Sequence, residues 1–173
     1  DKPEVIYQRF IERYKDDCAG FAREICGLEP TWQQEQMFQA IVKDDARVAC
    51  RSGHGTGKSC SIAIVLLWWL FCRPLSRVIV TSGSMGTIQN SLWPEVLGWF
   101  YRIANAEETQ IFKAWFECTT RSIYHKQRKD WKAEVRVVRT ENPQSIAGVH
   151  AKDLLYLVEE ASSLQLPEIY DVI

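Results

Sequence analysis

Apolar and polar residues alternate along this chain with two different periods, one helical and one typical of β-strands. In the first 26 residues, apolar side chains recur at spacings of three, four and seven between charged ones. This spacing predicts an amphipathic helix, or a helix pair broken near Gly20. Residues 27–30 are expected to form a turn, and Thr31 to cap a second helix over residues 32 to about 43. Residues 1–45 are therefore predicted to form an N-terminal helical segment.

Beyond residue 45, short apolar runs alternate with stretches of helical period. Five short runs have the apolar or β-branched composition of strands: residues 46–50, 77–81, 112–119, 131–140 and 153–158. Two stretches between the first three runs have helical spacing, at residues 62–72 and 87–105, where Pro94 is expected at a kink or in a first turn. This alternation is typical of a mostly parallel sheet flanked by helices on both faces. Residues 46–173 are therefore predicted to form one α/β core.

The sequence RSGHGTGKS, at residues 51–59, lies between the first of these strands and the first of these helices. Its glycines allow the backbone to curl so that successive amide N–H groups point at phosphate oxygens, and the next helix directs its positive end at the same place. A full phosphate-binding pattern has glycine where Ser52 stands. The alternative is a flexible glycine turn with an exposed lysine, but a strand before the motif and a helix after it favour a phosphate-binding loop.

Two residues at the end of this loop carry its expected chemistry. Lys58 would reach the β- and γ-phosphates of a nucleoside triphosphate, and the Ser59 hydroxyl would bind Mg2+. The residues expected to surround the triphosphate are Ser52, Gly53, His54, Gly55, Thr56, Gly57, Lys58 and Ser59.

Two acids, Glu159 and Glu160, follow the last predicted strand. An ATP-hydrolysing motor needs two carboxylates at the tip of such a strand, one to hold the Mg2+ shell and one to polarise the attacking water. We assign the first role to Glu159, where aspartate is the usual residue, and the second to Glu160. Acids are also favoured in the first turn of a helix, but the phosphate loop upstream requires a carboxylate partner, which favours the catalytic interpretation.

Gln33 is the candidate for contact with an adenine base. A glutamine amide places one donor and one acceptor side by side, which matches the N6 and N7 edge of adenine and does not match guanine. The alternative is a solvated polar helix face with Trp32 packed below it.

The composition is that of an ordinary soluble globular protein. Of the 173 residues, 46% are hydrophobic and 25% are charged, and the net charge is −1. The six cysteines lack a C-x-x-C pair or metal-ligand spacing, which indicates buried thiols in a reducing compartment. The apolar run at residues 62–72 is too short to span a bilayer, and His125 and His150 are expected to be surface or hydrogen-bonded histidines. The chain starts without methionine and stops within a pattern, so we expect a fragment.

Positive charge is concentrated in residues 121–139. Seven lysines or arginines stand there against two acids, Asp130 and Glu134, so the stretch is +5 in a chain of net charge −1. Tyr124 and Trp131 lie among the charges. The functional hypothesis is a basic hairpin that faces a phosphate backbone or a neighbouring subunit, and the alternative is a solvated hairpin tip.

Together these elements resemble the ATPase domain of the large terminase subunit of tailed double-stranded DNA phages and prophages. The resemblance rests on the order and spacing of four elements: RSGHGTGKS, the pair Trp32 and Gln33, residues 80–82 with 89–95, and residues 146–151 leading into LVEEAS. It implies an additional-strand P-loop ATPase, of the RecA/helicase-like type, that uses ATP and Mg2+ to pump double-stranded DNA into a procapsid. It also implies a ring on the portal protein, a small terminase subunit as partner, no membrane, the host cytoplasm as location, and a separate C-terminal nuclease.

The resemblance supports the roles given to Gln33, Lys58, Ser59, Glu159 and Glu160. It also implies a transition-state arginine, which many members of the family have inside the loop.

In this chain the corresponding loop position is His54. Arg51 in cis and Arg139 from a neighbouring subunit are the candidates for the missing arginine, and ordinary surface arginines are the alternative. In similar ATPases a further strand follows the acidic pair and inserts between the loop strand and the acidic strand. That strand would lie beyond residue 173, so we expect a gap in the sheet.

Two other functions stay open at this point. One is a helicase or remodelling ATPase of related architecture, which a second ATPase-like domain in the reading frame would favour over a nuclease domain. The other is a scaffold that binds ATP without turnover, which the non-standard Ser52 and Glu159 allow.

Overall fold

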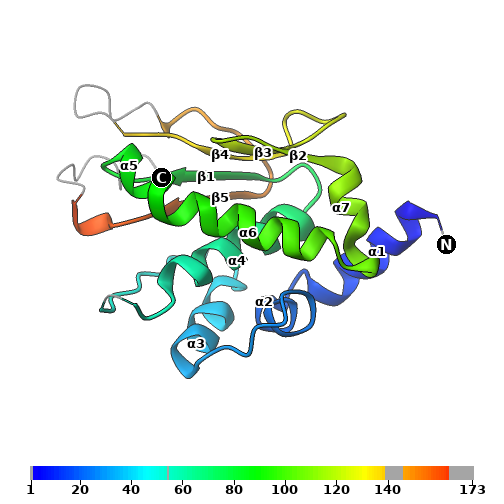
Figure 1. The fold of residues 1–173 in the computed structure, drawn as a ribbon, viewed down its shortest axis with the longest axis horizontal. Helices are drawn as coiled ribbons and strands as arrows, with labels where there is room; N and C mark the ends of the chain where they lie inside the picture. The colour runs from blue at the N-terminus through cyan, green and yellow to red at the C-terminus, as the bar shows by residue number, and fades with distance from the viewer. Residues whose placement is uncertain (1, 54, 139–145, 164–173) are drawn as a thin grey trace.

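The computed structural model describes residues 2–53, 55–138 and 146–163. A five-stranded sheet forms one layer, and the described helices lie on one side of it (Figure 1). No helix within these ranges is long and apolar enough to cross a membrane.

The N-terminal segment is a broken helix pair, as predicted. Helix α1 spans Pro3–Tyr14, and α2 (Cys18–Gly20) continues as a π-helical turn, η1 (Phe21–Ile25). The break lies at Asp17 and not at Gly20, because the Asp17 carboxylate accepts a hydrogen bond from the Gly20 amide and caps α2.

Helix α3 spans Trp32–Ile41 and begins at the predicted N-cap. The Thr31 hydroxyl accepts a hydrogen bond from the Gln34 amide, and the Gln34 side chain accepts one from the Thr31 amide. This reciprocal pair is a capping box, which satisfies two amide groups that a helix start leaves without partners.

Helix α4, at Lys58–Cys72, is the centre of the hydrophobic core. Its apolar run is buried, as predicted, including Trp68 and Phe71, both 0% exposed. The indole of Trp68 donates a hydrogen bond to the Tyr14 carbonyl at 2.7 Å, and the Tyr7 hydroxyl donates one to the Phe71 carbonyl at 2.8 Å. The N-terminal helices and the α/β part therefore share one core, and the division at residue 45 stays a prediction.

The sheet is mixed, whereas the sequence predicted a mostly parallel one. Its strands are ordered β2-β3-β4-β1-β5: β2 at Phe116–Cys118, β3 at Ser122–His125, β4 at Lys132–Val135, β1 at Arg77–Thr81 and β5 at Leu154–Val158. Strand β1 pairs in parallel with β4 and β5, while β3 pairs antiparallel with β2 and β4. The antiparallel part arises because short turns connect β2 to β3 and β3 to β4, and such turns reverse the chain direction.

Three strand predictions differ from the structure, and one of them is the prediction for residues 131–140, of which residues 132–135 form β4 and residues 136–138 form no strand. Residues 46–50 form no strand, and residues 47–50 are exposed. Within the described residues this run pairs with no strand, although the outer edge of β5 is left unpaired there. Residues 112–115 belong to helix α7 (Gln110–Trp115), because Phe112 is buried at helical spacing and stacks on Phe71 at 4.1 Å.

The segment after β1 is helical but irregular. It comprises α5 (Met85–Thr87), a π-helical turn η2 (Ile88–Leu92), α6 (Trp93–Ala104) and the 3-10 turn η3 (Glu107–Thr109). Pro94 lies in the first turn of α6, one of its two predicted positions, directly after the π-helical turn η2.

The two faces of the sheet differ in polarity. The pairing register places Val78, Ala133 and Leu155 side by side, and all three belong to the hydrophobic core around α4. On the opposite face the same register pairs Arg77 with Lys132. The prediction that helices cover both faces is wrong for the described residues, because the described helices lie on one side of the sheet (Figure 1). The second face carries charged side chains, among them Arg77 and Glu134.

His125 holds the hairpin between β3 and β4. Its ring is buried and stacks on Trp131, with ring centroids 5.0 Å apart. Its Nδ1 atom accepts hydrogen bonds from the amides of Gln127 and Arg128, each at 3.2 Å. Burial, with a smaller contribution from the Arg128 charge, lowers the pKa of His125. His125 is thus hydrogen-bonded, as one of the two predicted alternatives states.

Acidification is expected to destabilise the fold through His125. Because its pKa is lower in the folded state, the unfolded chain binds the proton first, so stability is fully present above the unfolded value of about 6.5 and falls as the pH drops below it. Urea unfolding at several pH values between 8 and 5 measures this. The His125→Gln variant, which keeps an acceptor without titrating, should lose less stability over the same range, and an unchanged pH dependence would contradict the assignment.

Candidate nucleotide-binding site

Residues 51–59 form a loop that ends at the amino terminus of α4. Gly55 and Gly57 have positive φ angles of 72° and 78°, which glycine adopts without the strain of a side chain. A Cβ at Gly57 would also lie 2.9 Å from Nε2 of Gln34, so both conformation and space favour glycine. His54 lies outside the described residues.

The loop is closed by its own polar groups. The Lys58 ammonium donates to the Ser52 carbonyl at 2.9 Å, and the Ser52 and Thr56 hydroxyls are hydrogen-bonded at 2.7 Å. Thr56 also donates to the Gly53 carbonyl at 3.0 Å. Ser52, which replaces the usual glycine, therefore contributes its hydroxyl to the loop.

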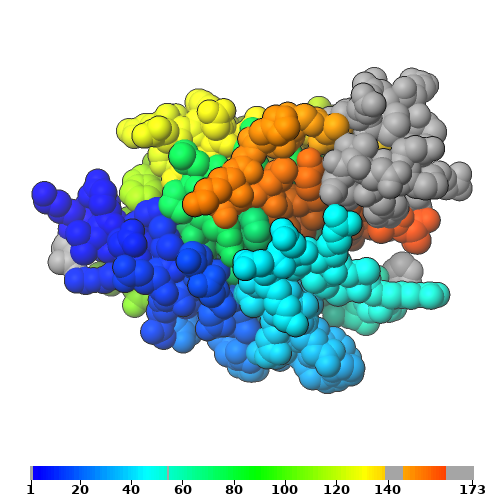
Figure 2. Space-filling view, turned by 180° about the vertical axis from the view of Figure 1, so that it is seen from behind, coloured from blue at the N-terminus to red at the C-terminus, as the bar shows by residue number. Residues whose placement is uncertain are grey.

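The predicted acidic pair lies next to this loop. Glu159 follows β5, and its amide donates to the Thr81 carbonyl at the end of β1. In Figures 1 and 2 the end of this segment, coloured orange-red, lies at the same end of the molecule as the teal loop. Glu159 thus lies at the carboxyl edge of the parallel strands, near the Lys58 loop.

Glu159 is half-buried and poorly satisfied. The pKa of Glu159 is raised, mainly by burial and also by the charge of Glu160, and the nearby positive charge of Lys58 offsets part of this rise. Among the described residues, Glu159 Oε2 and Thr81 Oγ1 are buried without a hydrogen-bond partner. Buried polar atoms without partners are costly, so these two atoms mark a place suited to a polar ligand.

Glu160 differs from Glu159 in exposure and in backbone conformation. It is exposed, and its φ angle of 51° lies in the left-handed region that non-glycine residues rarely adopt. Its Oε2 atom accepts a hydrogen bond from the Thr87 hydroxyl at 3.5 Å. The contact with Thr87 joins this carboxylate to α5.

Ser59 lies in the first turn of α4, where amide groups and the helix dipole favour anions. Its hydroxyl is 3.5 Å from the Ser91 hydroxyl, a contact that joins the loop to η2. Ser59, the expected Mg2+ ligand, is therefore partly exposed, and its described hydroxyl contact, with Ser91, is long.

The candidate adenine contact, Gln33, is exposed at the start of α3, and Trp32 beside it is 69% exposed. The alternative interpretation placed Trp32 packed below the helix, and its exposure contradicts that part of it. The glutamine that contacts the loop region is Gln34, whose amide nitrogen donates to the Ser61 hydroxyl at 3.0 Å and to the Gly57 carbonyl at 3.5 Å. Gln33 is thus accessible to a ligand, while Gln34 positions α3 against the loop.

Of the two candidate arginines, Arg51 is exposed beside the loop, and Arg139 lies outside the described residues. Sequence reasoning missed three residues of this region: Gln34, Thr81 and Thr87. The pattern of Thr31 followed by a glutamine at N3 could have identified Gln34 as part of a capping box, but its contact with Ser61 spans 27 residues and has no local signal.

The chain was also compared with known proteins. No family model matches it. It is similar to a probable terminase large subunit of Enterobacteria phage P7, with 26% identity over 168 residues. The similar region covers 91% of this chain and 32% of the relative, so the chain spans about a third of that protein's length. This finding confirms the resemblance to the large terminase subunit.

Proposed function

We propose, from the similarity to a phage terminase large subunit, that this chain is the P-loop ATPase part of a DNA-packaging motor. Such a motor hydrolyses ATP to move double-stranded DNA into a procapsid. The observation that carries the proposal is the meeting of the Lys58 loop with the half-buried Glu159 at one edge of the sheet.

The loop is suited to bind the triphosphate. Its backbone amides and the amino terminus of α4 favour an anion, and Lys58 can exchange its hydrogen bond with the Ser52 carbonyl for one with a phosphate oxygen. Arg51 beside the loop, or Arg139 from a neighbouring subunit, would supply further positive charge. Gln33, exposed at the start of α3, would contact adenine.

The residues at this edge of the sheet also fit Mg2+. Ser59 and Glu159 would hold the ion, since both offer the oxygen ligands that Mg2+ prefers. The buried Oε2 atom of Glu159, which has no partner within the described residues, supports this fit. Bound Mg2+ would neutralise phosphate charge during the reaction.

Glu160 is the proposed base. Its exposed carboxylate can orient a water molecule and accept its proton, and the contact with Thr87 restricts where that carboxylate lies. Double-stranded DNA, the portal protein, the small terminase subunit and further copies in a ring are the proposed partners, in the host cytoplasm.

Hydrolysis is expected to require Mg2+. Phosphate release from ATP by the full-length protein should fall to background when EDTA is added and return when Mg2+ is restored in excess. If the protein binds ATP but releases no phosphate even when Mg2+ is in excess, the nucleotide-binding scaffold is favoured instead.

A further inference from the structure

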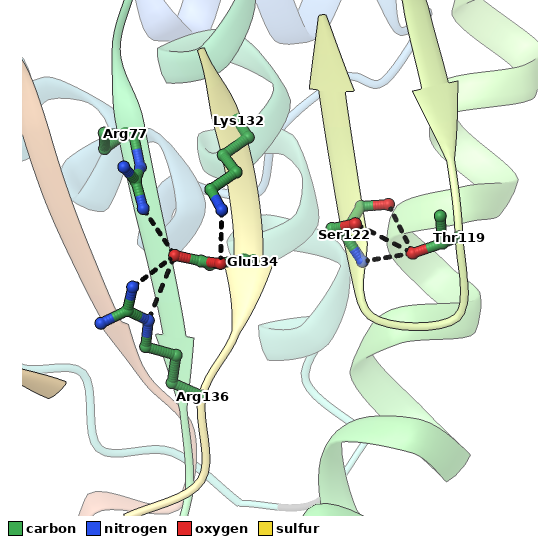
Figure 3. Close-up of polar contacts among 6 residues, drawn as sticks. All are labelled: Arg77, Thr119, Ser122, Lys132, Glu134 and Arg136. Atoms are coloured by element: carbon green, nitrogen blue, oxygen red, sulfur yellow. Dashed lines mark hydrogen bonds and ion pairs between the residues drawn. The ribbon is translucent and has the colours of Figure 1, made fainter. Parts of the chain in front are cut away.

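The second face of the sheet carries a charged cluster centred on Glu134. One Glu134 oxygen accepts hydrogen bonds from Arg77 at 2.6 Å and from Arg136 at 2.8 Å, while Lys132 lies 2.9 Å from the other (Figure 3). Burial alone raises the pKa of Glu134, but hydrogen bonds and charges from Lys132 and Arg136 outweigh it, and the pKa lies below its usual value. Three cations thus surround one ionised carboxylate.

The cations of this cluster exceed what Glu134 can neutralise. The side chains of Lys132 and Arg136 stay 28% and 30% exposed, and Nε of Arg77 is buried with no partner in the described part of the chain. The cluster therefore has an excess of positive charge on a sheet face that the described helices leave open.

The hairpin between β3 and β4 carries further positive charge next to this cluster. Lys126, Arg128 and Lys129 are exposed at its tip, with Asp130 as the acid among them. The Lys129 ammonium lies 4.0 Å from the centre of the Tyr124 ring, and Tyr124 pairs with Lys132 across the strands, so the tip joins the Glu134 cluster.

The tip has a defined conformation. The buried His125 ring accepts two amide hydrogen bonds from it, and the Lys126 ammonium donates to the Lys113 carbonyl at 3.3 Å. A preformed loop loses less conformational entropy when it binds than a flexible one.

We propose that Lys126, Arg128, Lys129, Lys132 and Arg136, called here the basic face, bind the phosphate backbone of a DNA duplex. This inference rests on the proposed function and names where its DNA substrate lies. From residue 132 to residue 136 an extended chain covers about 13 Å, and each DNA strand presents a phosphate about every 3.4 Å along the axis. Several phosphates therefore lie within reach of the basic face.

A duplex fits this surface better than an acidic protein partner does. Long cationic side chains outnumber the exposed acids Asp130 and Glu117 on this surface, and Tyr124 is the aromatic ring among them. Protein interfaces, in contrast, are depleted of lysine and have an apolar centre. Contacts of this kind hold the duplex without reading its sequence, as a motor that moves along DNA requires.

The hairpin tip of the basic face lies away from the nucleotide site, whereas Arg136 follows the carboxyl end of β4. The hairpin precedes β4 and lies at the amino edge of the parallel strands, opposite the carboxyl edge where Glu159 lies. In Figure 2 the yellow hairpin and the cyan to teal loop are at opposite ends. Changes in the hairpin can therefore be tested without altering the nucleotide site.

The test is the salt dependence of binding to a fluorescein-labelled DNA duplex, measured by anisotropy with full-length protein. For K126A/R128A/K129A, the slope of log K against log salt should become shallower by about one for each phosphate that the variant no longer neutralises. The matched control K2A/K15A/K43A removes three exposed lysines outside the hairpin and should keep the wild-type slope. Basal ATP hydrolysis without DNA should be unchanged in both.

An unchanged slope in the hairpin variant would overturn the proposal. If the hairpin variant also loses oligomers in sedimentation while its slope is unchanged, the basic face contacts a second copy of the chain and not DNA. If the triple variant fails to fold, the single reversal R128E should still make the slope shallower. Loss of hydrolysis in a Lys58→Ala control reports on the nucleotide site alone, so the two proposals fail separately.

Discussion

Replacing Lys58 by alanine is expected to lower ATP hydrolysis by at least about 100-fold, the usual effect of removing one group that stabilises transition-state charge. The fold should stay intact, because the described hydrogen bond of this side chain joins it to the exposed Ser52 carbonyl and not to the core. Phosphate release measures the rate, and circular dichroism with thermal unfolding measures the fold.

The matched control is Lys43→Ala, which removes an exposed lysine close in sequence to the loop. It should retain wild-type hydrolysis. Equal losses in the two variants would mean that net charge, and not the position of Lys58 in the loop, determines the rate.

Glu160→Gln is expected to reduce turnover by about 100- to 10,000-fold, the range for removal of a general base, while ATP binding persists. Glutamine has nearly the same shape and can still accept the hydrogen bond from Thr87, but it cannot take a proton from water at neutral pH. Turnover at saturating ATP and the affinity for a fluorescent ATP analogue, measured on the same preparation, separate the two effects.

Glu117→Gln is the control for this change, because Glu117 is an exposed glutamate on β2, the edge strand opposite β5. It should leave turnover unchanged. A Glu160→Gln variant that loses affinity as strongly as turnover would assign Glu160 to nucleotide binding and remove it as the base.

Local signals in the sequence predicted much of the helical structure. The Thr31 cap depends on residues within one helical turn, and the apolar run of α4 allows little besides burial. The motifs also predicted which segments meet at the site, because a loop before a helix and acids after a strand fix where their chemistry lies. The described geometry agrees with this for Lys58 and Glu159.

Pairing between distant segments could not be predicted from sequence. Residues 46–50 have strand composition but pair with no strand in the described fold, and composition does not say whether a segment finds a partner strand. The start of α7 was missed because Phe112 suits a strand as well as a helix, and its stacking on Phe71 decides between them.

The contacts that orient the site residues were equally hidden. Gln34 reaches Ser61, and Thr87 reaches Glu160 across 73 residues. Neither contact follows from spacing or composition, because each depends on how α3 and α5 pack against α4 and the sheet. Such positioning contacts require a structure.

The central claim is that the Lys58 loop and the acidic pair form one ATP-hydrolysing site. Its most direct test is phosphate release from MgATP, measured side by side for the wild-type protein and the Lys58→Ala and Glu160→Gln variants. The account predicts turnover by the wild type and at least about a 100-fold loss in each folded variant. Undiminished turnover in either variant would contradict it.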